Sequence, residues 1–167
     1  MNSDSERQKV HFIHGLESSP QSRKARVLAE HFDALTPAMD TADFEGCVGL
    51  QARAIAARPP AVVIGSSFGG AVLAALAPRG LWDGPCLFLC QAAVVRGLPL
   101  ALPTTAPVRI IHGLDDDVVA PADSRQLAEA NPRSNVQLSM VEDDHALHTS
   151  TSNGQLIAWV RDLLPPS

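Results

Sequence analysis

Six short apolar runs recur along the chain, and they constrain its fold more than any other feature. They occupy residues 10–14, 34–38, 61–65, 86–90, 108–112 and 136–141. Each has the length of a β-strand, and several are almost continuously apolar, as in parallel strands covered by helices on both faces. Helix-compatible segments lie between most of them, at residues 22–32, 44–57, 68–76, 121–129 and 154–164. This alternation predicts an α/β protein, a three-layer α/β/α sandwich around a parallel sheet of about six strands.

One stretch breaks the alternation. Within residues 91–107, the sequence Leu98-Pro99-Leu100-Ala101-Leu102-Pro103 has two prolines too close together for a stable helix. We therefore expect a loop there, at the mouth of the site. No repeat, low-complexity tract or linker divides the chain, so we expect a single domain over residues 1–167, with a flexible N-terminal segment at residues 1–8.

Composition excludes several classes of function. The 167 residues carry a net charge of −5, with acids and bases interspersed, so no basic face is available for nucleic acid or anionic lipid. No apolar run resembles a signal peptide or spans a bilayer, which predicts a cytoplasmic protein with no membrane partner. The cysteines Cys47, Cys86 and Cys90 are odd in number and lack C-x-x-C spacing, which argues against a disulfide framework.

The segment Gly65-Ser66-Ser67-Phe68-Gly69 joins the third apolar run to a helix-forming run. A G-x-S-x-G sequence between a strand and a helix is typical of a nucleophile elbow, in which the serine adopts a strained conformation. Only Ser67 fits the register, because Ser66 would require a glycine where Ile64 stands. The alternative is a Gly/Ser-rich turn that binds phosphate or only packs closely.

Acyl transfer at such a serine needs two N–H donors for the developing oxyanion. One is expected from the backbone of Phe68, the residue after the nucleophile, and the second from the loop after the first strand. Leu16, which follows His14-Gly15, is the best candidate there. We interpret His14 itself as a histidine that shapes this loop through backbone hydrogen bonds.

The fifth apolar run ends in His112-Gly113 and is followed by three adjacent aspartates. Three neighbouring carboxylates cannot all be buried in ionised form, so one should face an imidazole while the others face solvent or N–H donors. The spacing G-x-x-D-x-x-V selects Asp116. Asp115 is the second choice, and Asp117 is a candidate cap for the following turn.

A histidine that could serve as general base follows the last strand. His145 directly follows an acidic turn, and we favour it over His148, which lies nearer the final helix. The same loops also suggest a competing divalent-metal site, which the absence of a compact motif such as H-E-x-x-H disfavours. Its candidate ligands are Asp115, Asp116, Asp117, Asp143, Asp144, His145 and His148.

These motifs, in this order, resemble those of the alpha/beta-hydrolases over nearly the whole chain. The chain is most similar to short bacterial members that are esterase-like, whose N-terminal motif reads like the segment from His14 to Pro20. The resemblance implies the strand order 2-1-3-4-5-6, a triad of Ser67, Asp116 and His145, and an oxyanion hole from Leu16 and Phe68. It also implies that the chain lacks the first two strands of full-length relatives and their helical cap.

From this resemblance we expect a serine hydrolase that cleaves small or exposed carboxylic esters through an acyl-enzyme, with no cofactor and no metal. Its partner would be a small-molecule acyl substrate, in an open pocket walled by Leu16, Phe68 and the segment 98–102. Alternatives are a thioesterase or amidase with the same triad, or a non-catalytic binding protein on this scaffold. The sequence does not indicate the natural substrate or the oligomeric state.

Overall fold

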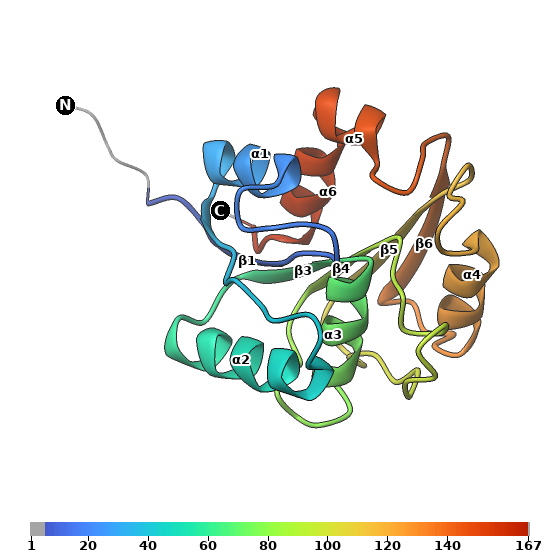
Figure 1. Cartoon of the computed structure of the whole chain (residues 1–167), viewed down its shortest axis with the longest axis horizontal. Helices are drawn as coiled ribbons and strands as arrows, with labels where there is room; N and C mark the ends of the chain where they lie inside the picture. Colours follow the sequence, from blue (N-terminus) through green and yellow to red (C-terminus); the bar gives the residue numbers. More distant parts are fainter. Residues whose placement is uncertain (1–5, 167) are drawn as a thin grey trace.

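A six-stranded parallel sheet forms the centre of the molecule (Figure 1). The structure is a computed structural model, and it describes residues 6–166. The strands are β1 (Lys9–Ile13), β2 (Asp33–Leu35), β3 (Val62–Ser66), β4 (Cys86–Leu89), β5 (Val108–Gly113) and β6 (Val136–Val141). Their spatial order is β2-β1-β3-β4-β5-β6, and every neighbouring pair is parallel, which confirms the predicted order.

Helices cover both faces of this sheet, as the apolar strands predict. They are α1 (Arg23–His31), α2 (Phe44–Ala57), α3 (Phe68–Leu76), α4 (Pro121–Glu129), α5 (His148–Ser152) and α6 (Gln155–Leu163). α1 and α6 lie on one face, and α2 and α3 on the other (Figure 1). The first two helices begin at side-chain caps, since Ser22 accepts from the N–H of Ala25 and Asp43 from that of Gly46.

The core is divided by the sheet into two apolar layers. In β3, Val63 packs into the layer beneath α2 and α3, whereas Val62 and Ile64 pack into the layer beneath α1 and α6. Alternate residues of a strand point to opposite faces, so both must be apolar when both faces are covered. This geometry explains why the strand runs are continuously rather than alternately apolar.

Most elements lie within one residue of their expected bounds, but two differ more. β2 covers Asp33–Leu35, where the sequence suggests residues 34–38, because Pro37 lacks the N–H that would continue the pairing. α5 was not predicted at all. Residues 91–107 contain no helix or strand, as predicted. Of the expected N-terminal flexible segment, residues 1–5 lie outside the described residues.

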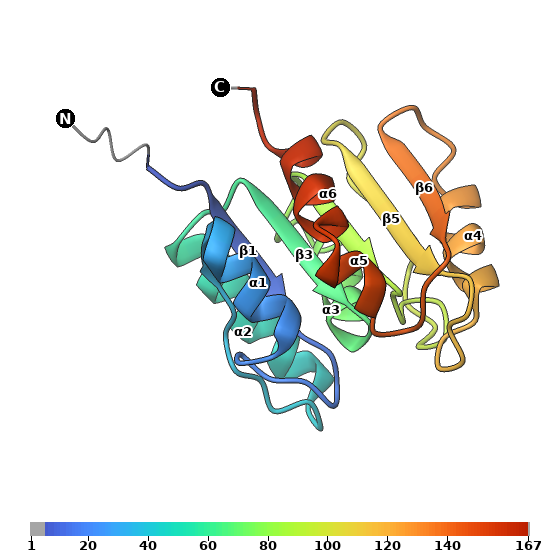
Figure 2. The ribbon, with the colours of Figure 1, turned by 90° about the horizontal axis from the view of Figure 1, so that it is seen from above.

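The carboxyl ends of the strands meet at one edge, where Figure 2 shows the arrowheads. The chain order reverses at β1, which lies between β2 and β3. In open parallel sheets, crevices for ligands form at this reversal point. Across residues 6–166, no helix is both long and apolar enough to cross a membrane.

Candidate active site

Ser67 lies in a sharp turn between β3 and α3, and its backbone is strained. Its φ is 55° and its ψ is −115°, a conformation that a residue with a side chain rarely adopts. The flanking glycines permit the turn: a β-carbon on Gly65 would lie 2.5 Å from the carbonyl oxygen of Gly69, and one on Gly69 would lie 1.9 Å from that of Ile13. The G-x-S-x-G sequence thus forms the predicted elbow.

The structure brings Ser67, His145 and Asp116 together from three separate loops. Ser67 Oγ is 3.0 Å from Nε2 of His145, and Nδ1 of His145 is 2.7 Å from Oδ2 of Asp116. These residues follow β3, β5 and β6, so the shared strand edge assembles them. Because Nδ1 faces a carboxylate, it carries a proton in the neutral ring, which leaves Nε2 free to accept the serine proton.

Asp116 is held as an ionised acceptor. Its Oδ1 accepts the N–H groups of Val118 and Val119, both at 2.8 Å, while Oδ2 faces His145. Burial opposes ionisation and raises the pKa of Asp116, but the hydrogen bonds from His145, Val119 and Val118 bring this pKa below its usual value.

The geometry distinguishes Asp116 from Asp115 and Asp117. Asp115 and Asp117 are exposed, so neither faces the imidazole. The alternative cap role for Asp117 is wrong, because Asp116 takes the N–H groups of the turn and α4 starts at Pro121 after Ala120 without a side-chain cap.

His148 forms its side-chain hydrogen bond with Asp144 and not with Ser67. It is exposed at the start of α5, and its Nδ1 is 2.6 Å from Oδ2 of Asp144. This hydrogen bond, together with the one from the backbone N–H of His148, lowers the pKa of Asp144 to about 2. His145 rather than His148 therefore has the geometry of a general base.

The two expected oxyanion donors are the backbone N–H groups of Phe68, which follows Ser67, and of Leu16, which lies in the loop after β1. Phe68 is the first residue of α3, where a backbone N–H has no acceptor within the helix. The loop after β1 also approaches closely, since a β-carbon on Gly15 would lie 3.6 Å from the β-carbon of Ser67. Leu16 follows in this loop and is half exposed. His14 shapes the loop as expected, with Nδ1 2.8 Å from the carbonyl oxygen of Gly15.

A cavity of about 630 Å³ opens at Ser67, within the size range of small-molecule sites. Leu16 and Val118 supply apolar lining, and the start of α1 contributes Arg23 and Lys24. Lys24 donates a hydrogen bond to the carbonyl oxygen of Ala146, the residue after His145, and burial lowers the pKa of its ammonium group. The cavity wall is therefore built from the loops after β1 and β5, the start of α1 and the loop that carries His145.

Two predicted parts of this wall are wrong. Phe68 is fully buried and packs edge-on against Phe44, so only its backbone can face the pocket. Segment 98–102 is also absent from the lining. Asn131 holds this segment against the end of α4, since its side chain accepts from the N–H of Leu102 and donates to the carbonyl oxygen of Leu100. Its leucines consequently pack against the core.

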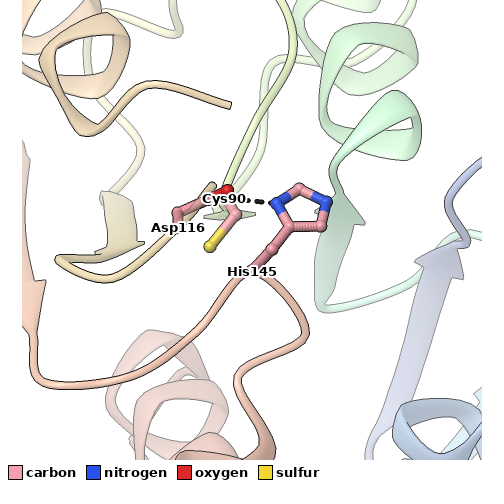
Figure 3. A group of neighbouring side chains, drawn as sticks. All are labelled: Cys90, Asp116 and His145. Carbon is pink, nitrogen blue, oxygen red and sulfur yellow. Dashed lines mark hydrogen bonds and ion pairs between the residues drawn. The ribbon is translucent and has the colours of Figure 1, made fainter. Parts of the chain in front are cut away.

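Cys90 completes a close group with the acid and the base. Its Sγ, an oxygen of Asp116 and a ring nitrogen of His145 all lie within 4.8 Å of one another (Figure 3), and this is the only such group among residues 6–166. Burial raises the pKa of the Cys90 thiol to about 12, so it stays protonated, and a thiol is a weak metal ligand. The metal-site alternative is not assembled as proposed, because Asp144 pairs with His148 and Asp115 and Asp117 face outward.

Beneath the triad lies a buried polar chain that sequence reasoning missed. It connects His112 of β5, Ser124 of α4 and Gln91 after β4, and all three side chains are fully buried. In the sequence, His112 stands out only as the histidine that ends the fifth apolar run. A signal was nevertheless present, since His112 stands four residues before Asp116 on one strand-end turn.

Fold and site together define a class: a protein with the alpha/beta-hydrolase fold that carries a serine, an acid and a histidine, in that chain order, on loops at the carboxyl edge of the sheet.

Solved structures share this fold. A protein from Xanthomonas campestris pv. campestris assigned to the alpha/beta hydrolase superfamily is 22% identical, with a TM-score of 0.73 over 95% of this chain and 100% of its own. The esterase domain of a Rhodothermus marinus protein is 18% identical (TM-score 0.70, 96% and 89% covered), as is mouse alpha/beta hydrolase domain-containing protein 10 (0.75, 93% and 88%). No family model and no curated protein matches the chain in sequence.

Proposed function

We propose that the protein is a serine hydrolase that cleaves carboxylic esters of small molecules through a covalent acyl-enzyme. The observation that carries this proposal is the continuous hydrogen-bonded path from Ser67 Oγ through His145 to Asp116, with a cavity open at the serine. Such a path activates a hydroxyl that is unreactive by itself. The esterase domain among the structures of the same fold supports the ester over other acyl substrates.

The proposed mechanism uses these three side chains and two backbone N–H groups. His145 Nε2 takes the Ser67 proton while Oγ attacks the ester carbonyl, and Asp116 stabilises the imidazolium that forms. The tetrahedral oxyanion is stabilised by the backbone N–H groups of Phe68 and Leu16. His145 then gives its proton to the leaving alkoxide as the C–O bond breaks. Water, deprotonated by the same ring, hydrolyses the acyl-enzyme and restores Ser67.

Labelling with a fluorophosphonate probe tests the nucleophile directly. The probe is expected to phosphonylate wild-type protein at one site and to leave Ser67→Ala unlabelled, because the Ser67 hydroxyl contacts a histidine at an open cavity. The hydroxyl of Ser124 also contacts a histidine, but this serine is fully buried and out of reach of the probe. Ser66→Ala is the matched control and should still label, since its hydroxyl has no hydrogen bond to His145. Equal labelling of wild type and Ser67→Ala would refute the assignment.

Turnover measurements then distinguish an esterase from a thioesterase, an amidase or a non-catalytic binding protein. Wild-type protein should hydrolyse a short p-nitrophenyl ester, and Ser67→Ala should lose this activity by about a thousandfold or more. Parallel assays with the matching thioester and anilide rank the acyl substrates. A wild-type protein that hydrolyses none of them and does not label would instead be a binding protein on a hydrolase scaffold.

A further inference from the structure

A second imidazole lies against the carboxylate of the triad. His112 Nε2 is 2.9 Å from Oδ2 of Asp116, the same oxygen that faces His145, and neither the His112 nor the Asp116 side chain is exposed to solvent. No step of the proposed mechanism uses the His112 ring. Its partners nevertheless determine where its proton lies.

The polar chain beneath His112 is directional. The N–H of Ala93 donates to Oε1 of Gln91 at 2.7 Å, so the amide nitrogen of Gln91 faces Oγ of Ser124 at 3.1 Å. An amide nitrogen can only donate, and Ser124 Oγ therefore accepts there. Among the described residues, the other hydrogen bond of Ser124 Oγ is to Nδ1 of His112, 2.6 Å away, so the serine's own proton is directed there. Nδ1 then accepts, and the neutral ring carries its proton on Nε2.

That Nε2–H group meets the turn that carries the triad acid. It donates to the carbonyl oxygen of Val119 at 3.0 Å, with Asp116 Oδ2 in reach as a second acceptor. The N–H of Val119 in turn donates to Asp116 Oδ1. His112 thus contacts the 116–119 turn at both its acidic side chain and its closing residue. The opposite tautomer would place a nitrogen lone pair against two oxygens.

We propose that His112 is a positioning residue whose neutral Nε2–H tautomer, imposed by Gln91 and Ser124, holds the 116–119 turn so that Asp116 faces His145. This inference rests on the proposed hydrolase function. A leucine of comparable volume would fill the same space but would offer no donor to the turn. A doubly protonated ring would pair with Asp116 as an ion and compete with His145 for the same oxygen.

The first test needs no turnover. The ¹⁵N shifts of the histidine ring nitrogens, recorded on wild-type protein at pH 7 to 8, report which nitrogen carries a proton. His112 is expected to show a protonated Nε2 and an unprotonated Nδ1. In Ser124→Ala, which loses the donor to Nδ1, a mixture of tautomers is expected. An Nδ1–H tautomer or a doubly protonated ring in wild type would overturn the proposal.

The second test separates a donor from a space-filling group. His112→Leu should lower kcat by about tenfold or more with little change in KM, because the reacting groups are misplaced while the substrate cavity is intact. His112→Gln, which restores a neutral donor, should recover most of the lost kcat. The matched control is His11→Leu, another fully buried strand histidine, whose ring is hydrogen-bonded to Gln51 and not to a residue of the triad.

The outcomes distinguish this inference from the proposed function. Full kcat in His112→Leu, or equal losses in His112→Leu and His112→Gln, would overturn the positioning role while ester hydrolysis by wild type still stood. Absence of both labelling and turnover in wild type would instead refute the proposed function. The tautomer measurement is unaffected by that result.

Discussion

The choice of general base is decided by single hydrogen bonds. His145 and His148 are three residues apart, yet only His145 contacts both Ser67 and Asp116, while His148 pairs with Asp144. His145→Ala should therefore lower kcat for an ester by about a thousandfold or more. His148→Ala should cost less than about tenfold, because it removes only an exposed part of the cavity lining. Comparable losses in the two variants, measured by steady-state kinetics, would contradict this assignment.

Residue-level prediction depends on motifs and chain order. Ser67 is selected by its G-x-S-x-G motif, Asp116 by the spacing of the loop after the fifth strand, and His145 by its position after an acidic turn. The structure places these three side chains in one hydrogen-bonded path. His112 could not be given a role in this way. Its partners Ser124 and Gln91 come from other elements, 12 and 33 positions from the residues they contact. Only the packed structure shows that they meet.

At the scale of elements, the elbow depends on how closely α3 approaches β1. A β-carbon on Gly69 would lie 1.9 Å from the carbonyl oxygen of Ile13, and backbone atoms on a central strand cannot move aside cheaply. Gly69→Ala should therefore destabilise the fold by about 2 to 3 kcal/mol. Denaturant unfolding monitored by circular dichroism measures this loss.

Gly49→Ala is the matched control for that substitution. Gly49 is also helical, but its nearest neighbour would be a terminal nitrogen of Arg53 at 3.2 Å, which belongs to a flexible side chain. Alanine should increase stability there by about 0.5 to 1 kcal/mol, because it restricts the unfolded chain and favours helix. If Gly69→Ala unfolded at the same denaturant concentration as wild type, the elbow would tolerate a wider separation of α3 and β1.

Helix α5 shows why some elements escape prediction. Its sequence, His-Thr-Ser-Thr-Ser, has no strong helix former and no apolar period, and it follows Leu147 in a left-handed conformation. The helix is held instead by buried Asp143, whose carboxylate accepts the N–H groups of Thr149 and Ser150. A carboxylate several residues before the helix is a tertiary cap, which local propensity does not reveal. The apolar strands, by contrast, can be predicted from their own residues, because continuous apolar sequence indicates a strand that is buried on both faces.

For the molecule as a whole, the cost of burying a neutral histidine links stability to pH. His11 is fully buried in β1, and burial lowers its pKa below the usual value; the hydrogen bond that its Nε2 donates to Oε1 of Gln51 opposes this effect, and the charge of Arg58 reinforces it. The unfolded state therefore binds the proton more readily than the folded state. Stability must then fall as pH decreases from about 6.5 toward the lower folded value, at up to about 1.4 kcal/mol per pH unit.

The depressed carboxyl pKa values act in a separate range. Asp116 and Asp144 both ionise more readily in the folded state, so their stabilisation is complete above the unfolded value near 4 and is lost only at lower pH. A decrease in the free energy of unfolding that starts near pH 6.5 is therefore caused by protonation of a histidine. His11→Leu tests this origin, because it removes the proton-binding group from both states.

Free energies of unfolding should be compared between wild type and His11→Leu at several pH values from 7 to 4.5. The variant has lower absolute stability, since the buried side-chain oxygen of Gln51 loses its partner at a cost of about 1 to 3 kcal/mol. Its dependence on pH should nevertheless be flatter than that of wild type below pH 6.5. Parallel curves would mean that His11 does not resist protonation in the fold, and that the acid sensitivity of the protein originates in another buried group.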